Sequence, residues 1–95
     1  MSAYFVARVN VTDPEKYSEY TRVTPGVIEK YGGRFVVRAG RTVTLDGPEV
    51  TDRIVVIEFS TLKKVQEFYN SEEYQQAKKL KEGAYTGWAV AVEGV

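Results

Sequence analysis

The chain has 95 residues, of which 43% are hydrophobic and 27% charged, which fits one small globular domain and is too apolar for a disordered segment. Its 13 acidic residues balance its 13 basic residues, so we expect neither nucleic acid nor a membrane as a partner. It contains no cysteine and no histidine, which excludes disulfides, thiolate chemistry and the commonest zinc or haem ligand.

The N-terminus lacks the basic-then-apolar pattern of a signal peptide, and no apolar run approaches the roughly 20 residues of a membrane span. We therefore expect a cytoplasmic protein with one domain over residues 1–95. We predict no cofactor and no metal site, because no acidic residues occur at a spacing useful for holding an ion.

A first strand is predicted over residues 3–11, where side chains of two kinds alternate with a period of two. Phe5 and Val9 lie on one of its faces, whereas Val6 and Arg8 lie on the other. The first face is therefore purely apolar, and the second one carries a charge.

A helix is expected after this strand, because Asp13 can cap its first turn and Pro14 suits its first position. Pro25 has no N–H to donate to the preceding turn, so we expect a kink or a break near Thr24. Gly32–Gly33 then supplies the left-handed conformation in which helices commonly end.

Two further strands are predicted over residues 34–40 and 53–59, joined by a long polar hairpin tip. The earlier one is expected to continue through residues 42–45, with Gly40 as a bulge. The later one is the most apolar run of the chain, interrupted by Glu58. A carboxylate in such a strand needs a cation, a hydrogen-bond donor or a ligand beside it.

The last third of the chain predicts two short helices and a strand. Ser60 can cap the first of these helices and Ser71 the second, and Gly83 stops the second one. Three lysines near that end are expected to be solvated, namely Lys78, Lys79 and Lys81. The final strand is expected over residues 86–93.

This order of elements, βαββαβ, is typical of a ferredoxin-like α+β fold. Right-handed crossovers then place the helices on one face of a four-stranded antiparallel sheet, with the first and third strands in the centre. The face expected against the helices carries Phe5, Val9, Phe35, Val37, Val55, Ile57, Trp88 and Val90. The opposite, helix-free face is also apolar, with Val6, Val36, Ile54, Val56, Ala89 and Ala91. Since no helix remains to cover it, we predict a homodimer in which the two helix-free faces pack together.

Three stretches of the sequence resemble the signature segments of domain-of-unknown-function family 1330, namely residues 31–40, 55–60 and 68–74. The resemblance implies the dimeric α+β barrel superfamily, which includes cofactor-free monooxygenases, haem-degrading enzymes, chlorite dismutases and lactone isomerases. The family itself has no agreed activity, so the resemblance informs the fold more than the function. A chain without histidine departs from the haem-binding branches.

Arg8, Arg38 and Glu58 form a first candidate site, because the predicted strands place all three on the helix-free face. Two arginines can grip the carboxylate or enolate of a small molecule. Partial desolvation would raise the pKa of Glu58 and suit it to general acid or base catalysis. The alternative is a buried ion-pair network that fixes the register of the dimer.

A second candidate site is an aromatic pocket between the helices and the sheet. Tyr17, Tyr20, Tyr69 and Tyr74 come from the helical segments, and Trp88 is expected opposite them on the sheet. These side chains either line a pocket for an aromatic ligand, as the resemblance to quinone-forming monooxygenases implies, or simply pack the core.

Two functions follow from these sites. In the first, a homodimer binds a small organic molecule, and any chemistry is cofactor-free, monooxygenase- or isomerase-like, and carried by Glu58 with Arg8 and Arg38. In the second, the protein is a non-catalytic dimerisation or ligand-sensing module whose charges are a structural interface network. The sequence leaves open whether the protein is an enzyme.

Overall fold

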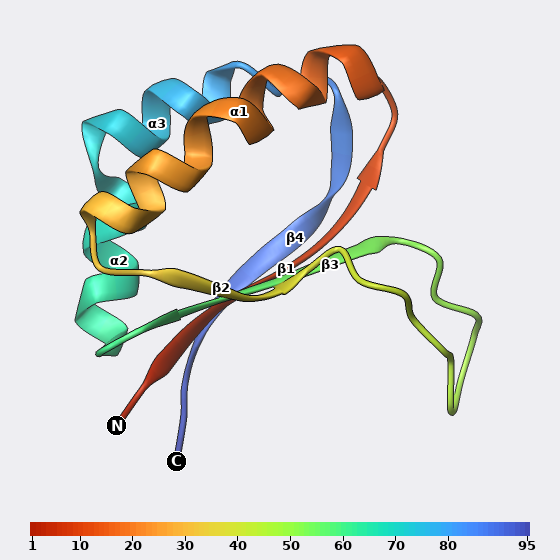
Figure 1. Cartoon of the computed structure of the whole chain (residues 1–95). Helices are drawn as coiled ribbons and strands as arrows, with labels where there is room; N and C mark the ends of the chain where they lie inside the picture. Colours follow the sequence, from red (N-terminus) through yellow and green to blue (C-terminus); the bar gives the residue numbers. More distant parts are fainter.

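The fold is a four-stranded antiparallel sheet with three helices on one of its faces (Figure 1). A computed structural model describes the whole chain, residues 1–95. Its elements are β1 (Ala3–Val11), α1 (Pro14–Lys30), β2 (Arg34–Arg38), β3 (Arg53–Phe59), α2 (Leu62–Asn70), α3 (Glu72–Lys79) and β4 (Tyr85–Glu93). The strand order β2-β3-β1-β4 confirms the ferredoxin-like α+β fold, with the first and third strands in the centre.

The core lies between the sheet and the helices. Every second residue of β1, from Ala3 to Val9, is buried there, as the alternating pattern predicts. The largest fully buried side chains come from β3, α2 and α3, namely Phe59, Val65, Phe68 and Tyr74. None of the helices is long and apolar enough to cross a membrane.

Helix α1 continues through Pro25 without interruption, so of the two predicted alternatives near Thr24 the break is wrong, and the kink stays a prediction. A proline removes one backbone hydrogen bond, and the burial of Thr24 and Ile28 on either side of it holds the helix together. The predicted end of the helix is confirmed. Gly32 adopts a left-handed conformation (φ 81°), and the N–H of Gly33 donates to the carbonyl of Ile28 at 2.9 Å.

The short helices begin largely as predicted. Thr61, rather than the predicted Ser60, caps α2, since its hydroxyl accepts from the N–H of Lys64 at 3.1 Å. Ser71 is confirmed as the cap of α3, because its hydroxyl accepts from the N–H of Tyr74 at 3.1 Å.

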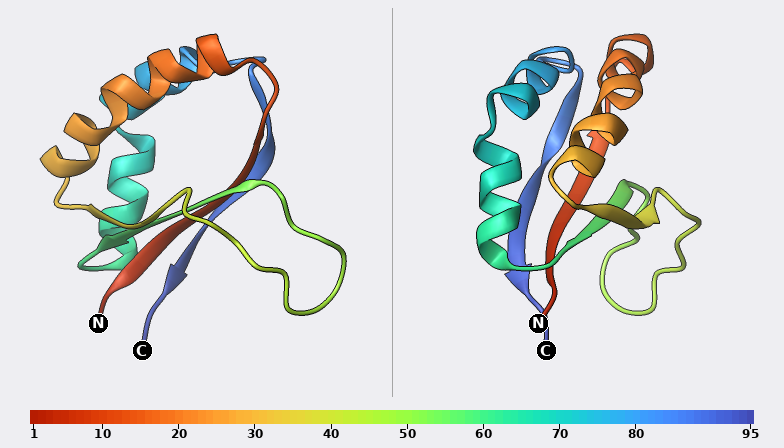
Figure 2. Two further views of the ribbon diagram at one scale, coloured as in Figure 1. Left: turned by 45° about the vertical axis from the view of Figure 1, so that its right-hand side comes forward. Right: turned by 60° about the vertical axis from the view of Figure 1, so that its left-hand side comes forward.

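The connection between β2 and β3 is a long loop over residues 39–52 that extends away from the body of the protein (Figure 2). The predicted continuation of the strand through residues 42–45 is therefore wrong. Ala39 has a positive φ of 53°, which ends the extended conformation directly after Arg38.

The bulge in β2 lies at Val36 instead of Gly40. The register shifts between Phe35 and Val37, which leaves Val36 as the extra residue. Directly paired residues of antiparallel strands share a face. Val37, which pairs with Val56, therefore lies on the helix-free face, and Arg38 lies on the helix-covered face. Both positions are the reverse of the prediction.

Strand β4 also presents the opposite faces to those predicted. Trp88 pairs with Arg8 and Val90 pairs with Val6, so both lie on the helix-free face. The small residues of the strand face the helices instead, namely Ala89 and Ala91. Two apolar faces alternate along this strand, so its pattern alone does not decide which one is covered.

Candidate functional site

A cavity of about 500 Å³ lies between the helices and the sheet. All four strands contribute to its floor, and all three helices contribute to its walls and roof. Its lining is mostly apolar and includes five tyrosines: Tyr17, Tyr20, Tyr69, Tyr74 and Tyr85. The structure thus brings the four tyrosines of the predicted aromatic pocket together around one space.

A pair of tyrosine hydroxyls links two of the helices that line this cavity. The hydroxyls of Tyr20 in α1 and Tyr74 in α3 lie 2.8 Å apart and share a hydrogen bond. Burial raises the pKa of both phenols above the ordinary value, and for Tyr20 the neighbouring Tyr74 adds to the shift. Both phenols are therefore neutral at physiological pH and act as hydrogen-bonding groups.

Lys81 is the most unusual residue of the cavity, because its side chain is charged and only 6% exposed. Its ammonium lies 4.1 Å from the ring centre of Tyr20 and 4.2 Å from that of Tyr85. Burial, reinforced by the nearby charges of Lys78 and Arg53, lowers the pKa of Lys81 to about 8. The prediction of a solvated Lys81 is wrong, since α3 ends at Lys79 and the following turn carries Lys81 inward.

Three further cations line the cavity. Arg53 places its guanidinium 5.5 Å from the ring centre of Tyr17, and its Nε is buried without a hydrogen-bond partner. Lys78 donates to the hydroxyl of Tyr69 at 2.8 Å. The exposed Arg38 is the fourth cation of the lining. No aspartate or glutamate lines the cavity.

Glu58 lies on the helix-free face, away from this cavity. Its Oε1 is 2.7 Å from Nη2 of Arg34, and the hydroxyl of Tyr4 donates to its Oε2 at 3.4 Å. Hydrogen bonds from Ser2 and Arg34 lower the pKa of Glu58 below its ordinary value. This direction is opposite to the raised pKa that the sequence suggested, and a lowered pKa makes the carboxylate a weaker base.

The predicted trio of Arg8, Arg38 and Glu58 does not assemble. Arg8 pairs with Asp52, at 2.9 Å between Nε and Oδ2. Arg38 lies on the other face of the sheet because of the bulge at Val36. The catalytic and ligand-binding roles assigned to these three residues stay predictions, but no single pocket joins them.

The other predicted ligand contacts divide between the two faces. Tyr20 and Tyr69 line the cavity, as expected. Trp88 is also among the residues that line the cavity, but its pairing with Arg8 places its side chain on the helix-free face. The sequence interpretation missed Arg53, Lys81 and Tyr85.

Signals for two of the missed residues were present in the sequence. Arg53 alternates with Val55 and Ile57, whose side chains were expected to face the helices. Lys81 follows Tyr74 and Ala77 at helical spacing and therefore continues a buried stripe.

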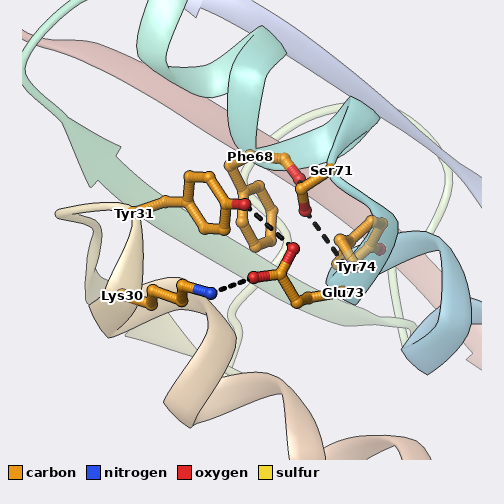
Figure 3. A network of polar contacts seen from close by, with 6 residues as sticks. All are labelled: Lys30, Tyr31, Phe68, Ser71, Glu73 and Tyr74. Carbon is orange, nitrogen blue, oxygen red and sulfur yellow. Dashed lines mark hydrogen bonds and ion pairs between the residues drawn. The ribbon is translucent and has the colours of Figure 1, made fainter.

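A polar cluster fastens the end of α1 to the start of α3 (Figure 3). The ammonium of Lys30 pairs with Oε2 of Glu73, and the hydroxyl of Tyr31 donates to Oε1 of Glu73 at 3.0 Å. The hydrogen bond from Lys30, supported by that from Tyr31, lowers the pKa of Glu73 to about 2. This contact holds together the two helices that roof the cavity. No group of three acidic residues is placed to hold a metal ion.

The model of a domain of unknown function, DUF1330, matches residues 2–95 of the sequence. The chain belongs to this family. Among proteins with curated descriptions, none matches the sequence significantly. The membership confirms the resemblance inferred from the three signature stretches.

The DUF1330 chain is similar to several solved structures. A Rhodopseudomonas palustris protein of unknown function superposes with a TM-score of 0.80 at 20% identity, over 99% of this chain and 82% of the other. SnoaB, a cofactor-independent oxygenase from Streptomyces nogalater, superposes with a TM-score of 0.69 at 12% identity, over 99% of this chain and 93% of SnoaB. A dimeric protein of unknown function with a ferredoxin-like fold, from Bacteroides fragilis, superposes with a TM-score of 0.64 at 14% identity, over 98% of this chain and 96% of the other. At these identities the likeness establishes the fold alone.

Proposed function

We propose that the protein binds a small organic molecule in the cavity between its helices and its sheet. The cavity itself is the observation that carries this proposal. Its volume of about 500 Å³ falls within the usual range of small-molecule sites, and its lining combines apolar side chains with a few polar groups. SnoaB, described as a cofactor-independent oxygenase, supports the proposal because it shows that this fold can serve a protein acting without a cofactor.

The functional unit in this proposal is a homodimer formed through the helix-free face. Three large side chains of β4 are about half exposed there: Trp88 (52%), Val90 (50%) and Val92 (47%). Together with Val6 and Val56 they make an apolar surface that a second copy of the chain would cover. The Bacteroides fragilis neighbour, described as dimeric, supports this arrangement.

The ion pair of Glu58 favours a structural role for the charges on that face. Arg34 neutralises Glu58, and Asp52 neutralises Arg8, so neither pair presents a free charge to a ligand. In the second candidate function these pairs set the register of the dimer, and the protein senses its ligand without converting it. Catalysis by Glu58 is the competing proposal.

Ligand binding is tested by titrating the full-length protein with 2-naphthylmethanol, a neutral aromatic probe, and recording methyl NMR spectra. We expect the signals of Ala7 and Ala89, which line the cavity, to shift, and those of Val56 on the other face to stay unchanged. Ala89→Phe fills the cavity and should weaken binding at least about tenfold, which is roughly 1.4 kcal/mol.

Thr86→Phe is the matched control, since Thr86 lies on the same strand but on the helix-free face, paired with the exposed Asn10. Probe binding that survives Ala89→Phe, or that shifts only residues of the helix-free face, would disprove the cavity as the ligand site.

A further inference from the structure

The charged residues that line the cavity are all basic, and none has an acidic partner. The four ion pairs of the chain are Arg8–Asp52, Lys30–Glu73, Arg34–Glu58 and Lys64–Glu67. They include none of the four cations of the cavity, Arg38, Arg53, Lys78 and Lys81. In a chain with zero net charge, this gathering of uncompensated positive charge is a local feature and not a consequence of composition.

Two of these cations also have unused hydrogen-bonding capacity. The Nε of Arg53 is buried and donates to nothing. Lys81 is almost fully buried against the faces of Tyr20 and Tyr85, and an aromatic face attracts a cation without accepting a conventional hydrogen bond. Both charges lie near the ring of Tyr17, at 5.5 and 5.6 Å from its centre, and the charge of Arg53 contributes to the lowered pKa of Lys81, so the two cations are neighbours. A buried charge without a counter-ion is unfavourable, so a cavity that keeps one is a candidate site for a ligand of opposite charge.

We infer that the cavity selects organic anions, binding the carboxylate of the ligand between Lys81 and Arg53 and the aromatic or alicyclic body of the ligand among the tyrosines. This inference rests on the proposed function and specifies the chemical class of its ligand. Arginine and lysine are the donors that match a carboxylate, and tyrosine rings provide an apolar surface with polar tips.

The same geometry gives the binding a pH dependence. The groups that face Lys81 are Tyr17 and Tyr20 of α1, Arg53 of β3, Lys78 of α3 and Tyr85 of β4. None of them is a carboxylate, and burial raises the pKa of Tyr17 and Tyr20, which keeps these phenols neutral. Lys81, with a pKa of about 8, is therefore the group that titrates next to the ligand. Affinity for an anion should fall as the pH rises above 8, and binding near that pH should take up a proton.

The test compares two probes of the same shape, 2-naphthoate and 2-naphthylmethanol, by calorimetry on the full-length protein. At pH 7 we expect the anion to bind at least about tenfold more tightly than the alcohol. Lys81→Met should abolish this preference, so that the anion and the alcohol then bind with similar affinity. Lys79→Met is the matched control, because it removes the same charge from an exposed position two residues earlier. It should keep the preference.

The possible outcomes separate this inference from the proposed function. If both probes bind equally, the anion inference is overturned and the cavity remains a ligand site. If neither binds, the proposed function fails and this inference fails with it. Should Lys81→Met not fold, as judged by its near-ultraviolet circular dichroism, Arg53→Met takes its place with the same expectation. A preference that survives in the folded variant overturns the inference, as does an anion affinity that does not fall between pH 7 and pH 9.5.

Discussion

The two faces of the sheet differ in whether their basic side chains form ion pairs. On the helix-free face, Arg8 pairs with Asp52 and Arg34 pairs with Glu58. On the helix-covered face, Arg53 and Lys81 are more enclosed and form no ion pair with a carboxylate. Coulombic and desolvation arguments predict the reverse distribution, because a buried charge needs compensation more than an accessible one does.

This difference indicates that the two sets of charges serve different purposes. Ion pairs within the chain leave a surface without net local charge, and at an interface they can fix how the two subunits align. Charges left uncompensated inside a cavity favour the binding of a ligand that carries the opposite charge. The comparison therefore supports the proposal that the ligand binds on the helix-covered face and the partner subunit on the helix-free face, and each half of this proposal can be tested separately.

The largest effect is expected from Val90→Asp, which places a carboxylate in the proposed interface twice, once from each subunit. An unpaired buried charge costs several kcal/mol, so we expect the dissociation constant of the dimer to rise by at least about 100-fold. Sedimentation velocity at micromolar concentration measures this. Val43→Asp, in the loop between β2 and β3 and 67% exposed, is the control and should remain dimeric. A wild-type monomer under these conditions would refute the assignment of this face.

The next largest effect is expected from Lys81→Met, because the buried charge of Lys81 lowers the stability of the folded protein. Its pKa falls from about 10.5 to about 8 on folding, so between these pH values the unfolded chain binds more protons and stability rises with pH. Below pH 8 the buried charge costs up to about 3 kcal/mol. We therefore expect Lys81→Met to be more stable than the wild type at pH 7, with a smaller gain at pH 9.5.

Urea denaturation at these two pH values, at one fixed protein concentration, measures the gain. Lys79→Met should show none of it, since that lysine is exposed. A loss of stability in Lys81→Met at pH 7 would mean that the folded chain already compensates this charge, which would remove the contrast between the two faces.

A smaller effect is expected from Glu58→Gln, because the pair with Arg34 is only half-buried. The neutral amide leaves Arg34 without its counter-charge, so dimerisation and Tm should fall, whereas the affinity for 2-naphthylmethanol should not change. The pKa of Glu58 is lowered on folding, so its contribution is present above the ordinary carboxyl pKa and disappears as the pH falls below it.

Glu49→Gln in the exposed loop is the control for this variant, because it removes the same charge from a solvated position. The opposite result, an unchanged dimer with loss of ligand binding or turnover, would restore Glu58 to the functional site and reject its purely structural role.

The fold was largely predictable from local patterns. The bounds of Ala3–Val11 and Arg53–Phe59 agree with the sequence prediction to the residue, because alternation and apolar content mark both strands clearly. The face of Arg38 was not predictable, because it depends on a bulge at Val36 within a run of similar residues. A shift of one residue moves every later side chain to the other face.

The candidate site was predictable only in part. The sequence analysis grouped Tyr20, Tyr69 and Tyr74 of the helical segments as one aromatic pocket, and the structure brings them together around the cavity. The uncompensated state of Lys81 and Arg53 was not accessible, because it depends on which cations the acidic residues reach in three dimensions. Asp52, for example, is the immediate neighbour of Arg53 in the sequence but pairs with Arg8.

The smallest effect is expected from Glu73→Gln, which removes an ion pair that belongs to neither face of the sheet. Its partner Lys30 is exposed, so solvent and salt screen the pair and its contribution to stability is modest. The pKa of Glu73 is about 2 in the folded chain, below the ordinary value near 4.5. The contribution is therefore fully present above pH 4.5 and is lost as the pH falls toward 2.

Thermal unfolding at pH 7 and pH 2.5 measures this: the variant should melt slightly below the wild type at pH 7 and nearly with it at pH 2.5. Glu72→Gln is the matched control, because Glu72 also lies in the first turn of α3 but has no ion pair, so it reproduces only the lost interaction with the helix dipole. If Glu73→Gln lowers stability more than Glu58→Gln does, the burial of the carboxylate does not determine how much these ion pairs stabilise the protein. The difference in ion pairing between the two faces would then need a cause other than burial.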